Sequence, residues 1–211
     1  MTRKGKGVGF IISILAAVVL TGCDFPYTVR KADFFHGDEP RFKPGPAGGI
    51  DQVDITEGAD FTRYKMVIID PVLFQFSSPA QYNAIPRGAL ENLRRDFRRA
   101  FTEALADAYP VVDSPRPDAL RLRTLITGLV PAIPGASAEE QWGYLSTGGA
   151  SMKAELLDSM TSERLIAGID TKTGEQLPAV QGRDEWVHAR EAFTFWGGRL
   201  RSFLDTIHGK K

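Results

Sequence analysis

One thiol is the most reactive side chain in this 211-residue sequence, because Cys23 is its only cysteine. A thiolate is a strong nucleophile that can form a thioether, and a lone thiol leaves no disulfide and no cysteine-based metal site. Cys23 follows an apolar run from Val8 to Leu20, and basic residues at positions 3, 4 and 6 precede that run. This is the arrangement of a secretory signal peptide that ends before Cys23. The alternative role for Cys23 is that of a buried free cysteine.

The apolar run is too short to be a permanent membrane span. Its 13 residues from Val8 to Leu20 would extend about 20 Å as a helix, against a hydrocarbon core of about 30 Å. We therefore expect residues 1–22 to be a signal peptide that is removed.

The tetrapeptide Leu20-Thr21-Gly22-Cys23 resembles the lipobox of bacterial lipoproteins. The resemblance implies cleavage between Gly22 and Cys23 by a type II signal peptidase, a diacylglyceryl thioether on Cys23 and acylation of the new amino group, for example with palmitate. Two or more acyl chains hold a protein firmly at a bilayer without a spanning helix. We expect a lipoprotein on the periplasm-facing side of a bacterial cell-envelope membrane, with this covalent lipid and no other cofactor.

Asp24 directly follows the lipidated position. An aspartate there resembles the signal that retains lipoproteins in the inner membrane of enteric bacteria. Retention in the inner membrane is therefore favoured slightly over delivery to the outer membrane. The alternative is a solvated aspartate that has no effect on sorting.

The composition is that of a folded domain, with 43% hydrophobic and 25% charged residues. The whole chain has 26 basic and 26 acidic side chains. Loss of the signal peptide removes three of the basic ones and leaves a mildly acidic mature protein. Nucleic acid is therefore not an expected partner.

The segment after Cys23 predicts a tether, because residues 24–63 are rich in proline and glycine and have no sustained hydrophobic period. Its aromatic residues, including Phe34, Phe35 and Phe42, are unusual for a spacer. Whether part of the segment docks on the folded domain is left open. The expected organisation is a signal peptide over 1–22, a lipidated N-terminus and tether over 23–63, and a single α/β domain over 64–211.

Hydrophobic periodicity predicts five elements in the domain. A buried strand over 64–76 is interrupted or bent at Asp70-Pro71, and a half-buried strand follows at 120–130. Residues 150–170 predict a hairpin, and amphipathic helices are predicted over 88–109 and 185–208. We expect an α+β fold with a mostly antiparallel sheet and both helices packed on one face.

With these elements in place, the chain resembles a family of bacterial lipoproteins with a domain of unknown function, DUF 3313. The resemblance is carried by Asp60 to Phe76, Ala119 to Pro131, Gly149 to Gly174, and the Trp186 to Leu204 helix with its second tryptophan, Trp196. It implies an envelope lipoprotein with an α/β domain and no assigned chemistry. The family usually has glycine after Thr161, where this chain has Ser162, so the hairpin turn is expected to differ.

No catalytic constellation is visible in the sequence. The histidines His36, His188 and His208 lack metal-binding spacing, and no GxSxG nucleophile elbow is present. Glu155 and Asp158 could form an acid/base pair, but alternation favours a solvent-facing Glu155 and a turn role for Asp158. We expect no enzyme activity and no metal site.

Two features could contact a partner. Arg94, Arg95, Arg98 and Arg99 form a basic run on the first helix, although nearby acidic residues could pair with them and leave an ordinary solvated face. Trp142 and Tyr144 lie in a loop of small and polar residues, where they could form a contact hot spot or fold onto the sheet edge.

The leading hypothesis is a non-enzymatic binding or accessory module that binds another envelope protein. The first alternative is an envelope hydrolase acting on peptidoglycan or lipid, which a deep pocket with two carboxylates would support. The second alternative is a structural homo-oligomer that pairs through a sheet edge. The sequence leaves the oligomeric state open.

Overall fold

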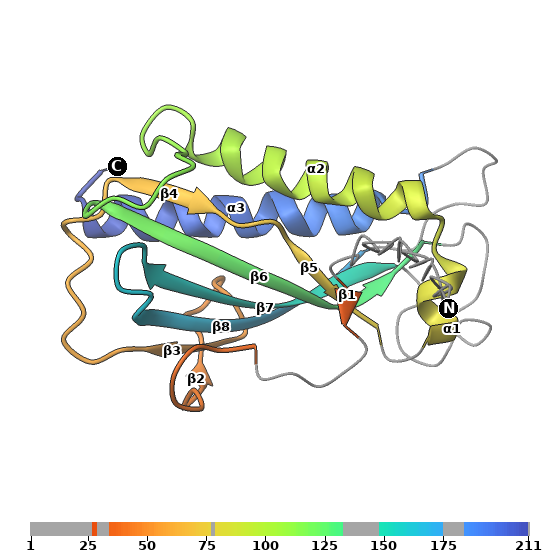
Figure 1. Ribbon diagram of the computed structural model, residues 1–211, viewed down its shortest axis with the longest axis horizontal. Coiled ribbons are helices and arrows are strands. Elements are labelled where there is room, and N and C mark those ends of the chain that lie inside the picture. Colours follow the sequence, from red (N-terminus) through yellow and green to blue (C-terminus); the bar gives the residue numbers. More distant parts are fainter. Residues whose placement is uncertain (1–26, 29–33, 77–78, 133–147, 175–183, 211) are drawn as a thin grey trace, which may run out of the picture.

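The fold is described by a computed structural model that places residues 27–28, 34–76, 79–132, 148–174 and 184–210. Within these residues eight strands form one sheet, in the order β1-β5-β6-β7-β8-β3-β2, with β4 also beside β6 (Figure 1). The strands are β1 (Tyr27–Thr28), β2 (Lys43–Pro44), β3 (Gln52–Ile55), β4 (Met66–Ile69), β5 (Leu73–Gln75), β6 (Ala119–Val130), β7 (Gly149–Asp158) and β8 (Arg164–Thr173). The helices are α1 (Pro79–Ala84), α2 (Arg87–Leu105) and α3 (Val187–Ile207).

The sheet is mixed, so the expectation of a mostly antiparallel sheet is wrong, although the α+β class is right. β4 and β5 both pair with β6 in parallel, and β1 pairs with β5 in parallel. The cause is the α2 crossover between β5 and β6, because a strand that returns through a helix joins the sheet in the same direction. The strands that follow, β7 and β8, are antiparallel to their neighbours.

The predicted break at Asp70-Pro71 is confirmed, since β4 ends at Ile69 and β5 begins at Leu73. Proline cannot donate a backbone hydrogen bond to a neighbouring strand. The chain also gains one residue relative to β6 across the break, because Ile69 lies opposite Leu122 whereas Leu73 lies opposite Leu125. The two strands therefore pair separately with one long partner.

Helices α2 and α3 run side by side on the same side of the sheet (Figure 1). The inner face of α2 is formed by Leu90, Leu93, Phe97, Phe101 and Leu105, all buried. It meets α3 through the edge-to-face pair of Phe97 and Phe193, whose ring centroids are 5.3 Å apart. The apolar residues whose spacing predicts the helices are therefore the residues that the helices bury in the core. Among the described residues, no helix is both long and apolar enough to cross a membrane.

The segment expected to be a tether is part of the fold at β1 and again from Phe34 onward, so it docks on the domain, which the sequence left open. Phe34 is buried, and β3 pairs with β8 in an antiparallel ladder from Gln52 to Ile55. β2 then pairs with β3 at the sheet edge. A domain boundary at residue 64 is therefore too late, because these residues complete the sheet. Residues 29–33 lie outside the described part.

The β7–β8 hairpin is confirmed, and its turn contains a residue in a strained conformation. Ser162 has a φ of 61° in the left-handed region, which costs a non-glycine residue about 1–2 kcal/mol. Ser162→Gly is expected to raise the free energy of unfolding by about 1 kcal/mol, after the greater freedom of glycine in the unfolded chain is subtracted. Chemical denaturation measures this. Ser202→Gly, in the regular helix α3, is the control and should lower stability; an unchanged Ser162→Gly variant would contradict the prediction.

Candidate functional site

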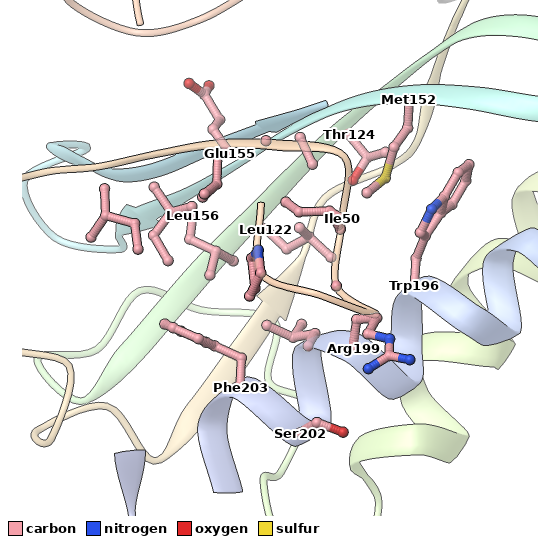
Figure 2. A pocket seen from close by; sticks show the side chains of 18 of the residues that line it. Ile50, Leu122, Thr124, Met152, Glu155, Leu156, Trp196, Arg199, Ser202 and Phe203 are labelled. Carbon is pink, nitrogen blue, oxygen red and sulfur yellow. The ribbon is translucent and has the colours of Figure 1, made fainter. Parts of the chain in front are cut away.

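A cavity of about 450 Å³ lies between the sheet and the C-terminal half of α3 (Figure 2). Its size is within the range of small-molecule sites, about 300–1,000 Å³. The sheet contributes Leu122 and Thr124 from β6, Met152, Ala154 and Leu156 from β7, and Ile166 and Gly168 from β8. The helices contribute Phe101 from α2 and Trp196, Arg199, Leu200, Ser202, Phe203 and Thr206 from α3. Most of this lining is apolar.

The outer wall of the cavity comes from β3 and the β2–β3 loop. Val53 and Ile55 on β3, and Ile50 in the loop, line it. The loop closes through a hydrogen bond in which Gly45 N–H donates to Asp51 O at 2.8 Å. A Cβ at position 45 would lie only 1.8 Å from Ile50 O, so this turn requires glycine. The predicted tether thus builds one wall of the site.

Two polar groups lie in the same half of the cavity. Thr124 is only 2% exposed, and its hydroxyl has no hydrogen-bond partner among the described residues. Arg199 is exposed and lies over the ring of Phe195 at 4.8 Å, with no carboxylate partner in the described part of the chain. Figure 2 shows Thr124, Trp196 and Arg199 toward one end, and Leu156 and Phe203 toward the other. One end of the cavity therefore carries the charged side chain of Arg199, and most of the remaining lining is apolar.

Trp196 is held at this end by a buried carboxylate. Its indole N–H donates to Asp170 Oδ2 at 2.6 Å, and Asp51 N–H donates to Asp170 Oδ1 at 2.8 Å. Burial raises the pKa of Asp170, although these two hydrogen bonds act in the opposite direction. Asp51 in turn accepts from Thr171 N–H at 3.0 Å. The same contacts therefore fix the tryptophan and the beginning of β3.

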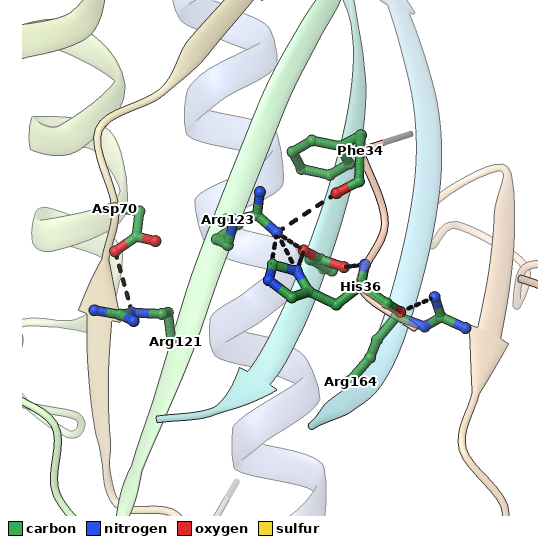
Figure 3. Close-up of polar contacts among 7 residues, drawn as sticks. Phe34, His36, Asp70, Arg121, Arg123 and Arg164 are labelled. Atoms are coloured by element: carbon green, nitrogen blue, oxygen red, sulfur yellow. Dashed lines mark hydrogen bonds and ion pairs between the residues drawn. The ribbon is translucent and has the colours of Figure 1, made fainter. Parts of the chain in front are cut away.

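Glu155 is buried, so the expectation of a solvent-facing Glu155 is wrong. Its backbone borders the cavity, but its carboxylate points away from it (Figure 2). On the opposite face of the sheet it forms an ion pair with Arg123, accepts from His36 N–H at 2.9 Å, and contacts His36 Nδ1 at 2.6 Å (Figure 3). Arg164 binds His36 O. Strand alternation correctly predicted the face of the sheet on which the Glu155 side chain lies, but the segment that contains Phe34 and His36 covers that face.

Asp158 begins the hairpin turn, as predicted. Its Oδ1 accepts from Met160 N–H at 2.8 Å and Thr161 N–H at 2.9 Å. Its Oδ2 accepts from Tyr64 Oη at 2.8 Å and from Arg63 Nη2 at 2.5 Å. Glu155 and Asp158 are therefore bound by different partners, and neither carboxylate is directed into the cavity.

These contacts make the stability of the protein depend on pH through Asp158. Burial alone would raise the pKa of Asp158, but the hydrogen bonds from Thr161, Tyr64 and Met160 and the Arg63 charge lower it below the ordinary 3.8. The stabilisation is therefore complete above that value and is lost as the pH falls through the lower pKa of the folded state. Between about pH 5 and pH 2, the wild type should lose more free energy of unfolding than Asp158→Asn. Parallel curves would contradict this prediction.

The arginines proposed as partner contacts are engaged within the fold. Arg94 pairs with Glu91, and Arg99 pairs with Asp96 at 2.6 Å. Arg98 donates to Ile69 O and to Asp113, both at 2.9 Å, and Arg95 donates to Asn92. Contact with a partner would have to compete with these interactions.

The other predicted site residues lie outside the described part of the chain. They are Gly22, Cys23 and Asp24 near the N-terminus, and Trp142 and Tyr144, which precede β7 in the sequence. Within the described ranges, no group of three or more histidine, cysteine or acidic side chains is arranged to hold a metal. His188 is buried and pairs with Glu191.

The cavity itself was missed in the sequence. Val53 and Ile55 alternate with Asp54, which is a strand signal, but the run is short and the surrounding prolines and glycines favour a tether. No local pattern marks Thr124 or Arg199. Each is typical of its own strand or helix, and only packing brings them to one cavity.

Comparison with solved structures finds similarity at low sequence identity. The PelC dodecamer from Paraburkholderia phytofirmans matches with 10% identity and a TM-score of 0.42, over 71% of this chain and 96% of that chain. Protein XCC0632 from Xanthomonas campestris matches with 15% identity and a TM-score of 0.37, over 81% and 94%. A putative neuraminyllactose-binding hemagglutinin homolog from Helicobacter pylori matches with 10% identity and a TM-score of 0.35, over 72% and 87%.

Comparison of sequences places the chain in a family. No curated protein is significantly similar to it. The family model described as "Protein of unknown function (DUF3313)" matches residues 41–200, from just before β2 into the second half of α3. These residues include β2, β3 and most of the residues that line the cavity. The chain therefore belongs to the DUF3313 family.

Proposed function

We propose that this protein is a lipid-anchored, non-enzymatic binding module of the bacterial cell envelope. The anchor is Cys23, because the sequence before it has the order of a lipoprotein signal. Mass spectrometry of the membrane-extracted protein should find a thioether-linked diacylglyceryl group and an acylated amino group at Cys23. A product that starts at another residue, or an unmodified Cys23 on a soluble protein, would contradict the anchor.

The domain binds an apolar group in the cavity beneath α3. The observation that carries this proposal is the combination of a volume of about 450 Å³ with a wall of aliphatic and aromatic side chains. A protein normally fills an apolar space of this size with its own side chains, because empty apolar volume is destabilising. The buried carboxylates of Glu155 and Asp170 already accept hydrogen bonds from donors of the chain itself. Binding is therefore favoured over acid/base catalysis.

The experiment compares small molecules retained by the native protein and by variants with a blocked cavity. The full chain is extracted with surrounding membrane into polymer discs, and bound molecules are detected by native mass spectrometry. Ala154→Phe fills the floor of the cavity, and Ala47→Trp narrows its entrance at the exposed β2–β3 loop. Both variants should lose the bound apolar molecule.

Ala106→Trp is the matched control, since Ala106 is exposed just after α2 and does not line the cavity. It should retain the same molecules as the wild type. Circular dichroism confirms that each variant is folded. If folded Ala154→Phe and Ala47→Trp proteins retain the same molecules as the wild type, the cavity is not the binding site.

A further inference from the structure

The polar end of the cavity identifies the class of ligand. Arg199 is the charged side chain of the lining whose ionised group lies at the cavity, because the carboxylate of Glu155 points to the opposite face of the sheet (Figure 2). In the described part of the chain its guanidinium has no carboxylate partner, whereas Arg201, two residues later, binds both Asp107 and Asp205. Arg199 is therefore available to an anion.

The neighbourhood of Arg199 adds a second cation. Lys172 Nζ lies 4.1 Å from the ring centroid of Phe195, and Arg199 Cζ lies 4.8 Å from the same centroid. Lys172 also approaches Asp170 Oδ2 at 3.7 Å, but that oxygen already accepts from the indole of Trp196. The two cations therefore share one aromatic ring beside the cavity. A carboxylate at Arg199 would be attracted by both.

The rest of the cavity fits one alkyl chain. From Arg199 the lining continues one turn along α3 to Phe203, and on the sheet from Thr124 to Leu122 and from Met152 to Leu156. β6 and β7 are antiparallel, so the direction from Thr124 to Leu122 on β6 is the direction from Met152 to Leu156 on β7. The apolar side chains on both strands and on α3 therefore line the cavity from the Arg199 end to the Phe203 end (Figure 2). At its polar end the polar contact comes from Arg199, because the hydroxyl oxygen of Thr124 is itself buried below the cavity surface.

We propose that the cavity binds a fatty acid, with its carboxylate at Arg199 and its alkyl chain between Leu156 and Phe203. This inference rests on the proposed apolar binding function and adds the charge of the ligand. Burial of each methylene favours binding, and the ion pair at the exposed end selects an anionic head.

The test uses the full lipidated chain anchored in phosphatidylcholine liposomes. A palmitate analogue with a photoreactive diazirine on its alkyl chain is cross-linked, and the labelled peptides are identified by mass spectrometry. Unlabelled palmitate and hexadecanol, which has the same alkyl chain with an uncharged head, serve as competitors. Arg199→Gln removes the proposed anion contact, and Arg95→Gln removes an equally charged side chain from the exposed face of α2.

The wild type should be labelled on peptides of β7 and α3. In Arg199→Gln the affinity for palmitate should fall about tenfold, which is the effect of losing one charged hydrogen bond. The affinity for hexadecanol should not change, and Arg95→Gln should behave as the wild type. Comparing the two competitors across variants removes the effect of their partition into the bilayer, because that partition is the same for every variant.

Equal competition by hexadecanol and palmitate in the wild type, with no effect of Arg199→Gln, would overturn the fatty-acid assignment and leave apolar binding intact. Stronger competition by lysophosphatidylcholine than by palmitate would overturn it in favour of a phosphate-headed lipid. Labelling of β7 and α3 that is no higher in the wild type than in Ala154→Phe would overturn both the fatty-acid assignment and the proposed function.

Discussion

Glu155→Ala is expected to lower the free energy of unfolding by about 3 kcal/mol, because it breaks a buried ion pair and leaves its partners without an acceptor. Glu155 has a fully buried side chain, whereas Arg123 is 24% exposed, which places the effect at the lower end of the range for buried pairs. The same change removes the acceptor of His36 N–H. The segment that begins at Phe34 should then separate from the sheet.

Two measurements test this expectation. Chemical denaturation gives the loss of stability, and hydrogen exchange should show lower protection for residues 34–42 than in the wild type. Glu155→Gln keeps the size and one acceptor, so it should lose less stability than Glu155→Ala. Glu163→Ala is the control, since Glu163 is exposed in the hairpin turn, and it should change stability by less than about 0.5 kcal/mol. Unchanged protection of residues 34–42 in Glu155→Ala would show that Glu155 does not hold this segment against the sheet.

Gly197→Leu is expected to be similarly severe, at about 3 kcal/mol, because it forces α2 and α3 apart. Gly197 is buried where α3 packs against α2. A Cβ there would lie 3.0 Å from Ala100 O and 3.3 Å from Ala104 Cβ. A leucine cannot be accommodated against a backbone oxygen at that distance, and the helix interface of the core would open. The loss of packing should also perturb Trp196, the preceding residue, which lines the cavity.

The adjacent glycine provides the matched control. Gly198 has no atom within 4 Å of its added Cβ, so Gly198→Ala should raise the free energy of unfolding by about 0.5–1 kcal/mol through helix propensity alone. Thermal and chemical denaturation of both variants measure the difference. The prediction fails if Gly197→Leu is as stable as the wild type, or if the two glycines respond in the same direction.

The same pair shows how far sequence reasoning extends. The sequence predicts α3 from its apolar spacing and predicts that two glycines in a helix have a cost. It does not distinguish them, because the reason for Gly197 is a backbone oxygen on α2, 97 positions earlier in the chain. The mixed sheet, in contrast, follows from the order of the elements in the sequence. A strand, a helix and a strand in succession indicate a parallel crossover, which a mostly antiparallel sheet does not contain.

The sequence by itself determined the positions of the two long helices, the β6 strand, the β7–β8 hairpin, the break at Asp70-Pro71 and the turn at Asp158. Each depends on neighbours within a few residues, whose periodicity and backbone chemistry are visible in any short window. Only the tertiary structure decided that β1, β2 and β3 of the predicted tether join the sheet, that Glu155 is buried, and that Thr124 and Arg199 share a cavity. These features depend on partners such as His36 and Glu155, which are 119 positions apart. No local pattern encodes which distant surfaces meet, since that choice is made by the packing of the whole core.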